Sequence, residues 1–125
     1  MTSTIERFAG PGAEWDACVR TDSAWTHFHR WGWKAVIEQV FEHECLYFAA
    51  RDVAGQVAGV LPLVHARSLL FGDYLVSMPF LNYGGPLGSE PAVQALVEHA
   101  LGIARERRVD LLELRSRGVV RRSPP

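Results

Sequence analysis

Apolar residues recur with helical spacing in three stretches of the chain. Trp15, Cys18 and Val19 share one face of a short helix that follows the break at residues 10–12. The second helix is longer, and its apolar face consists of Trp33, Val36, Ile37, Val40 and Phe41. Its candidate N-caps are Asp22, Ser23 and Thr26. The third helix is predicted to begin after Ser89 and to end near Arg107.

Short apolar runs between these helices predict strands at residues 3–8, 44–51, 56–67, 73–79 and 109–114. Residues 44–51 are apolar on both alternating faces, and the turn at 52–55 returns the chain antiparallel. Pro62 cannot donate a ladder hydrogen bond, so the strand is bulged there or lies at an edge on that side. The last strand pair and the intervening helix predict a right-handed parallel crossover. The expected fold class is α/β, with a mixed α+β sheet.

Composition and charge narrow the class of protein. A chain of 125 residues with 48% apolar and 22% charged residues suits one globular domain. The formal net charge of -1 provides no field that attracts nucleic acid, so no stable nucleic-acid complex is expected. Four arginines lie near the C-terminus: Arg115, Arg117, Arg121 and Arg122. They either bind phosphates or belong to a solvated tail, and the tail is favoured, so residues 116–125 are predicted to form a disordered basic tail.

Two cysteines, Cys18 and Cys45, are too few for a disulfide framework and suit a reducing compartment. There is no run of about 18 apolar residues and no basic start followed by an apolar stretch. We therefore expect a cytoplasmic protein with no membrane span.

A glycine loop, Asn82-Tyr83-Gly84-Gly85-Pro86, connects the strand at 73–79 to the third helix. Adjacent glycines permit positive φ and close approach to a ligand. The loop matches neither a Walker loop nor a dinucleotide fingerprint, because the residues that follow those motifs are missing. It is either a tight turn or one wall of a binding site.

Other reactive side chains leave alternatives open. His27, His29, His43 and Cys45 lack metal-ligand spacing, so no metal is expected, and a Cys45 nucleophile is disfavoured on a buried strand. The aromatic residues Trp25, Phe28, Trp31, Trp33 and Tyr47 form either core or a groove wall, with Trp31 favoured for the groove. Glu113 and Arg115 point to one side of the last strand, as an ion pair or with Glu113 as a catalytic carboxylate.

Several segments, in this order and spacing, resemble the FemAB-related proteins of the exosortase (PEP-CTERM) system. They are FHRWGW at 28–33, GVLPLV at 59–64, SLLFG at 68–72, LVSMPF at 75–80, YGG at 83–85 and LELR at 112–115. The resemblance implies a fold like the GNAT acyltransferases. Family members typically carry two such units, so residues 1–115 are expected to form the N-terminal unit of an incomplete GNAT-like fold.

The resemblance also implies a chemistry. The better-known members transfer aminoacyl groups from charged tRNA to a peptidoglycan precursor, by attack of an amine on an activated ester. The Arg/Gln-x-x-Gly-x-Gly/Ala loop that holds coenzyme A in ordinary GNAT enzymes is missing, so no cofactor is expected.

The expected function is an acyl or aminoacyl transferase domain acting on a cell-envelope or exopolysaccharide-related acceptor. Its partners would be a small-molecule, glycan or peptide acceptor and an acyl or aminoacyl donor, with a homodimer through an exposed sheet edge also considered. The substrate groove is assigned to Ser77, Pro79, Asn82, Tyr83, Gly84, Gly85 and Trp31, with Tyr83 as a hydrogen-bond donor. The alternative is a non-catalytic binding module or a fragment without activity of its own.

Overall fold

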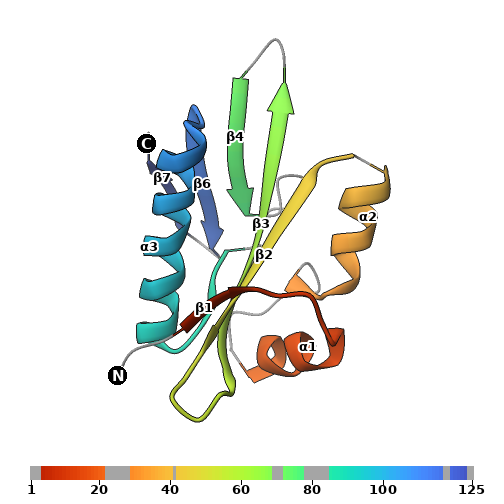
Figure 1. Ribbon diagram of the computed structural model, residues 1–125, viewed down its shortest axis with the longest axis vertical. Helices are drawn as coiled ribbons and strands as arrows, with labels where there is room; N and C mark the ends of the chain where they lie inside the picture. Colours follow the sequence, from red (N-terminus) through yellow and green to blue (C-terminus); the bar gives the residue numbers. More distant parts are fainter. Residues whose placement is uncertain are drawn as a thin grey trace.

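The computed structural model describes residues 4–21, 29–40, 42–68, 72–77, 85–116 and 119–123. Over these ranges the chain forms three helices and seven strands (Figure 1). In chain order they are β1 (Thr4–Arg7), α1 (Gly12–Thr21), α2 (Gly32–Val40), β2 (Glu44–Arg51), β3 (Val57–Ser68), β4 (Gly72–Ser77), β5 (Leu87–Gly88), α3 (Glu90–Arg107), β6 (Leu111–Ser116) and β7 (Val119–Ser123).

One mixed sheet joins the strands in the order β1-β2-β3-β4-β6-β7, with β5 added beside β3. Neighbouring strands are antiparallel except for β4 and β6, which run parallel with Val76 opposite Glu113. Helix α3 connects this parallel pair, as the sequence predicted. The mixed sheet confirms the α/β fold class.

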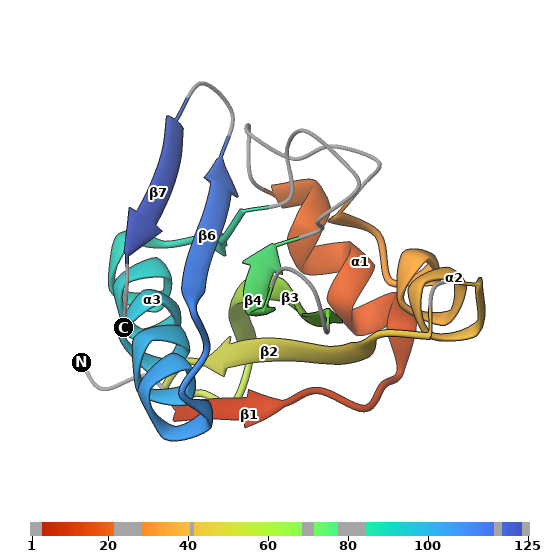
Figure 2. The ribbon, with the colours of Figure 1, turned by 90° about the horizontal axis from the view of Figure 1, so that it is seen from above.

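The sheet lies between α3 on one side and α1 and α2 on the other (Figure 2). Each face has its own hydrophobic core, because side chains alternate along every strand. The core on the α3 face includes Leu46, Leu61, Leu63, Leu96 and Leu112. The core on the α1/α2 face includes Trp15, Val19, Ile37, Tyr47 and Val64. The prediction that Trp15, Cys18 and Val19 face inward is confirmed.

Strand β3 shows how a proline is accommodated inside this sheet. On one side, residues 59–60 pair with β5 and the ladder with β4 starts at Leu63. Pro62, opposite Tyr47 of β2, falls between these two ladders within the described residues. The register shift of the β2–β3 pair lies elsewhere, at residues 50–51. The residue that would continue the β4 ladder opposite Pro62 lies outside the described residues, so the edge alternative stays a prediction.

Helix α3 begins and ends where the sequence predicted. Ser89 has extended backbone angles, and its side chain accepts a hydrogen bond from the amide of Ala92, so it is the N-cap. Arg108 closes the other end in the left-handed conformation, with φ of 54°. The helix packs closely on β3, since a Cβ atom added at Gly59 would lie 2.8 Å from Cβ of Ala92.

Helix α2 differs from its prediction. Ile37 is buried, but Val36 and Val40 are 38% and 68% exposed. Phe41 and the candidate caps at 22, 23 and 26 lie outside the described residues. The helix therefore touches the sheet along a narrow line and leaves part of its apolar face uncovered in the described structure.

Two strands were not predicted. Strand β5 spans only two residues, too few for a periodic pattern. Strand β7 occupies part of the tail that was expected to be disordered, and it pairs antiparallel with β6. Its two valines, Val119 and Val120, follow Gly118 and favour a hairpin return. None of the described helices combines the length and apolar composition needed to cross a bilayer.

Candidate functional site

The glycine loop rejoins the described structure at Gly85, where it is attached to the segment that precedes α2. The Nε2 atom of His29 lies 2.9 Å from the carbonyl oxygen of Gly85, and both residues are buried. The indole nitrogen of Trp15 in turn donates a hydrogen bond of 2.8 Å to the carbonyl oxygen of His29. Helix α1 therefore positions His29, and His29 positions the end of the loop.

Four aromatic residues, Phe8, Trp15, Trp31 and Tyr47, form an aromatic cluster on the α1/α2 face of the sheet. Trp15 stacks on Tyr47 with ring centroids 5.1 Å apart. Trp31 lies edge-on to Phe8 and to Tyr47, at 5.4 and 5.8 Å. Trp31 thus packs against the core while remaining partly exposed. Its backbone amide donates a hydrogen bond of 2.8 Å to Oδ1 of Asp16 in α1.

A hollow of about 470 Å³ opens beside Trp31, between α1 and the start of α2. We call it the α1–α2 hollow, and the described residues that line it are Asp16, Arg30, Gly32, Trp33 and Val36. Its described lining combines one carboxylate, one guanidinium and two apolar side chains. The sequence drew attention to Trp31 and Trp33 but gave no reason to select Asp16 or Arg30.

The predicted groove residues are only partly described. Pro79, Asn82, Tyr83 and Gly84 lie outside the described residues. Ser77 is fully buried at the carboxyl end of β4 and pairs with Leu63, which belongs to the α3-face core. Directly paired residues project to the same face of a sheet, so the Ser77 side chain lies on the α3 face. Trp31, in contrast, lies on the α1/α2 face.

Glu113 on β6 does lie on the face of the aromatic cluster. It pairs with Val76, and Val76 pairs with Val64 of the α1/α2-face core. Its side chain is buried, at 6% exposure. The side chain of Arg115, its predicted partner, lies outside the described side chains.

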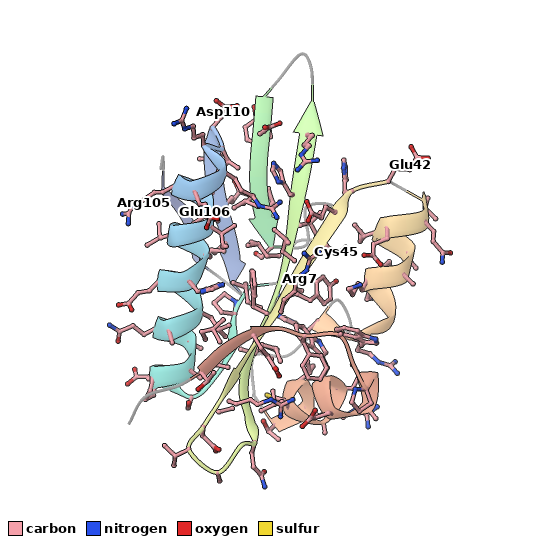
Figure 3. All side chains as sticks on the ribbon, viewed as in Figure 1. Arg7, Glu42, Cys45, Arg105, Glu106 and Asp110 are labelled. Carbon is pink, nitrogen blue, oxygen red and sulfur yellow. The ribbon has the colours of Figure 1, made fainter. Side chains whose placement is uncertain are left out.

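Cys45 has the environment of an unreactive thiol. It is fully buried, and its Sγ atom donates to the carbonyl oxygen of Lys34 at 3.7 Å. Burial raises the pKa of Cys45 from 9.0 to about 12. Figure 3 shows the residue near Arg7 at the centre of the sheet. Within the described ranges, no group of three or more histidine, cysteine or acidic residues is arranged to hold a metal ion.

A second polar site lies on the α3 face, and we call it the Glu44 network. The carboxylate of Glu44 accepts hydrogen bonds from Arg107 at 2.8 and 3.3 Å and from Arg67 at 3.4 Å. Nη2 of Arg7 lies 3.5 Å from Oε2 of Glu44. The hydrogen bond from Arg107 is the main reason why the pKa of Glu44 is lowered.

His65 belongs to the same network and is only 3% exposed. Nη1 of Arg107 lies 3.0 Å from its Nδ1. Because a guanidinium only donates, Nδ1 must accept and the ring proton must be on Nε2. Nε2 has no hydrogen-bond partner in the described structure, and Oδ2 of Asp73 is 3.9 Å away. Burial, followed by the charges of Arg67 and Arg107, lowers the pKa of His65.

Comparisons with known proteins add no relative. No protein-family model matches the chain, and no match was found among curated proteins or among solved structures.

Proposed function

We propose that the chain is a FemAB-like acyl or aminoacyl transferase domain, with a GNAT-like fold, that acts on a cell-envelope or exopolysaccharide-related acceptor. The observation that carries the proposal is the parallel pair β4 and β6 inside an otherwise antiparallel sheet. The carboxyl ends of parallel strands open on the same side, and ligands of α/β proteins bind at such ends. In the sequence the glycine loop follows this end of β4, and Gly85, which belongs to the loop, lies beside His29.

The proposed reaction is attack of an acceptor amine on an activated acyl ester. Such a reaction needs positioning of the two substrates, stabilisation of the developing oxyanion and removal of a proton from the amine. Glu113 is our candidate for proton removal, because its buried carboxylate lies on the same face as the aromatic cluster. Tyr83 is our candidate hydrogen-bond donor, and Trp31 and Gly85 would form the opposite wall.

The test is a transfer assay with charged tRNA as donor and amine-bearing peptides or amino sugars as acceptors. Glu113→Gln keeps the shape of the side chain but removes the base, so we expect kcat to fall about a hundredfold or more. Glu98→Gln, on the exposed side of α3, is the matched control and should retain full activity. Melting temperatures of both variants show whether an activity loss reflects folding.

Tyr83→Phe tests the donor separately. Reduced turnover with unchanged thermal stability supports the groove, whereas unchanged turnover removes the role assigned to Tyr83. If the wild-type chain binds an acceptor but transfers nothing from any donor, the binding-module alternative takes the place of the transferase.

A further inference from the structure

The α1–α2 hollow carries two opposite charges that do not neutralise each other. Asp16 and Arg30 both line it, yet no ion pair within 4 Å joins them in the described structure. Separated, the two groups present a negative and a positive point to whatever enters the hollow.

The carboxylate is positioned by the fold. Oδ1 of Asp16 accepts the hydrogen bond from the Trp31 amide, which fixes the side chain, while no donor among the described residues contacts Oδ2. Asp16 is only partly exposed. Its orientation is therefore set before any ligand arrives, which lowers the entropic cost of binding.

The guanidinium of Arg30 complements it. Arg30 is exposed, and its side chain makes no hydrogen bond or ion pair with the described part of the chain. No described residue occupies its donors, and the planar guanidinium is well shaped to bind a carboxylate.

Two further described residues of the lining are apolar. Trp33 and Val36, one turn apart on α2, contribute an indole and a branched side chain, and Val36 is 38% exposed. The volume of about 470 Å³ is within the usual range for small-molecule sites. The hollow thus offers a cation site, an anion site and an apolar surface together.

We propose that the α1–α2 hollow binds the zwitterion of an α-amino acid with an apolar side chain. The ammonium group binds Oδ2 of Asp16, the carboxylate binds Arg30, and the side chain packs on Trp33 and Val36. A simple anion is repelled by Asp16 and a simple cation by Arg30, so a zwitterion satisfies both charges where either ion alone does not. This site is independent of the transferase proposal, since binding there requires no transfer chemistry.

The test is isothermal titration calorimetry of the full chain with L-leucine and its blocked forms. We expect L-leucine to bind with a Kd of about 1 mM or tighter. N-acetyl-leucine lacks the ammonium group, leucinamide lacks the carboxylate and glycine lacks the apolar side chain, so each should bind at least about tenfold more weakly. The dipeptide Leu-Leu carries the ammonium group and the carboxylate on different residues, so it should also bind at least about tenfold more weakly than L-leucine.

Two variants test the named residues. Asp16→Asn retains the Oδ1 acceptor for the Trp31 amide but removes the charge, and Arg30→Gln removes the guanidinium. Each should weaken L-leucine binding by about tenfold or more. Arg20→Gln, on the exposed surface of α1, is the matched control and should bind as the wild type does.

The proposal is overturned if L-leucine does not bind, if the blocked forms bind equally well, or if both variants bind as the wild type does. Thermal melts show whether the variants fold. Should either variant fail to fold, the ligand series on the wild-type chain decides the question alone.

Discussion

Two buried side chains on the central strands, Cys45 and His65, show how position controls reactivity. The two residues lie on opposite faces of neighbouring strands. The pKa of Cys45 is raised and that of His65 is lowered, so both shifts favour the neutral form. In each case the first cause is burial, which disfavours the charged state. Reactivity at these residues therefore depends on opening of the structure.

For Cys45 this yields a measurable expectation. With a pKa of about 12 instead of 9.0, the thiolate fraction at neutral pH is about a thousandfold lower. In the Cys18→Ser variant, which leaves Cys45 as the one thiol of the 125-residue chain, labelling by a disulfide reagent should be far slower in buffer than in denaturant. Rapid labelling of the folded protein would contradict the buried position of Cys45.

At this scale the sequence allowed some predictions and not others. It identified Cys45 as buried because its strand is apolar on both faces. It gave no indication of Asp16, because the hydrogen bond that the Trp31 amide donates to Asp16 joins residues 15 positions apart through tertiary packing. A single acidic residue on a short helix carries no local signal of such a contact.

At the scale of elements, two glycines distinguish close packing from free space around α3. Gly59 of β3 faces the helix, and an added Cβ atom would meet Ala92 at 2.8 Å and the carbonyl oxygen of Leu87 at 3.0 Å. Gly102 lies on the exposed side of α3, where an added Cβ atom meets nothing within 4 Å. The same substitution should therefore have opposite effects at the two positions.

We expect Gly59→Ala to lower the free energy of unfolding by about 1 to 3 kcal/mol, because the helix must move away from the strand. Gly102→Ala should raise it by about 0.5 to 1 kcal/mol, because alanine favours the helix. Chemical denaturation of both variants measures these changes. A stabilising Gly59→Ala would show that α3 does not pack on β3 as described.

Elements with a long repeating pattern were predicted well. Helix α3, with its cap at Ser89, and the buried strand β2 follow from local sequence alone. The exposed part of α2 was missed, because helical spacing shows which residues share a face but not whether a neighbour covers it. Strands β5 and β7 were missed since one is very short and the other contains three polar residues among five.

At the scale of the whole molecule, the Glu44 network links distant parts of the chain. Arg7 comes from β1, Glu44 from β2, His65 and Arg67 from β3, Asp73 from β4 and Arg107 from α3. Protonation of His65 would end its acceptance of the hydrogen bond from Arg107 and add a third positive charge beside Arg67 and Arg107.

The stability of the protein should therefore depend on pH. Because the pKa of His65 is lowered on folding, the unfolded chain binds the proton first as the pH falls. The stabilisation is complete above about pH 6.5 and is lost as the pH falls below it. Glu44, whose pKa is also lowered, adds a further loss below its usual value of 4.5.

Urea denaturation between pH 7 and pH 5 measures this dependence. His65→Gln keeps an acceptor for Arg107 but does not titrate, so its free energy of unfolding should change less over this range. His99, whose pKa burial lowers as well, accounts for a second part of the slope. The variant that replaces both His65 and His99 should therefore show a weaker pH dependence of the free energy of unfolding than either single variant. An unchanged pH dependence would exclude both histidines as its source.

The general architecture was accessible from the sequence, but the Glu44 network was not. Glu44 and Arg107 are 63 residues apart, and no periodic pattern relates them. Their contact depends on the register of three strands and on where α3 ends.

The arrangement of α3 also has a consequence for synthesis of the protein. Strands β2, β3 and β4 pair in chain order, so this meander is complete once Ser77 has been made. The helix that covers its apolar α3 face comes later, at residues 90–107. During translation Leu61, Leu63 and Leu75 therefore stay exposed until α3 has been made. At this stage the growing chain is most prone to aggregation.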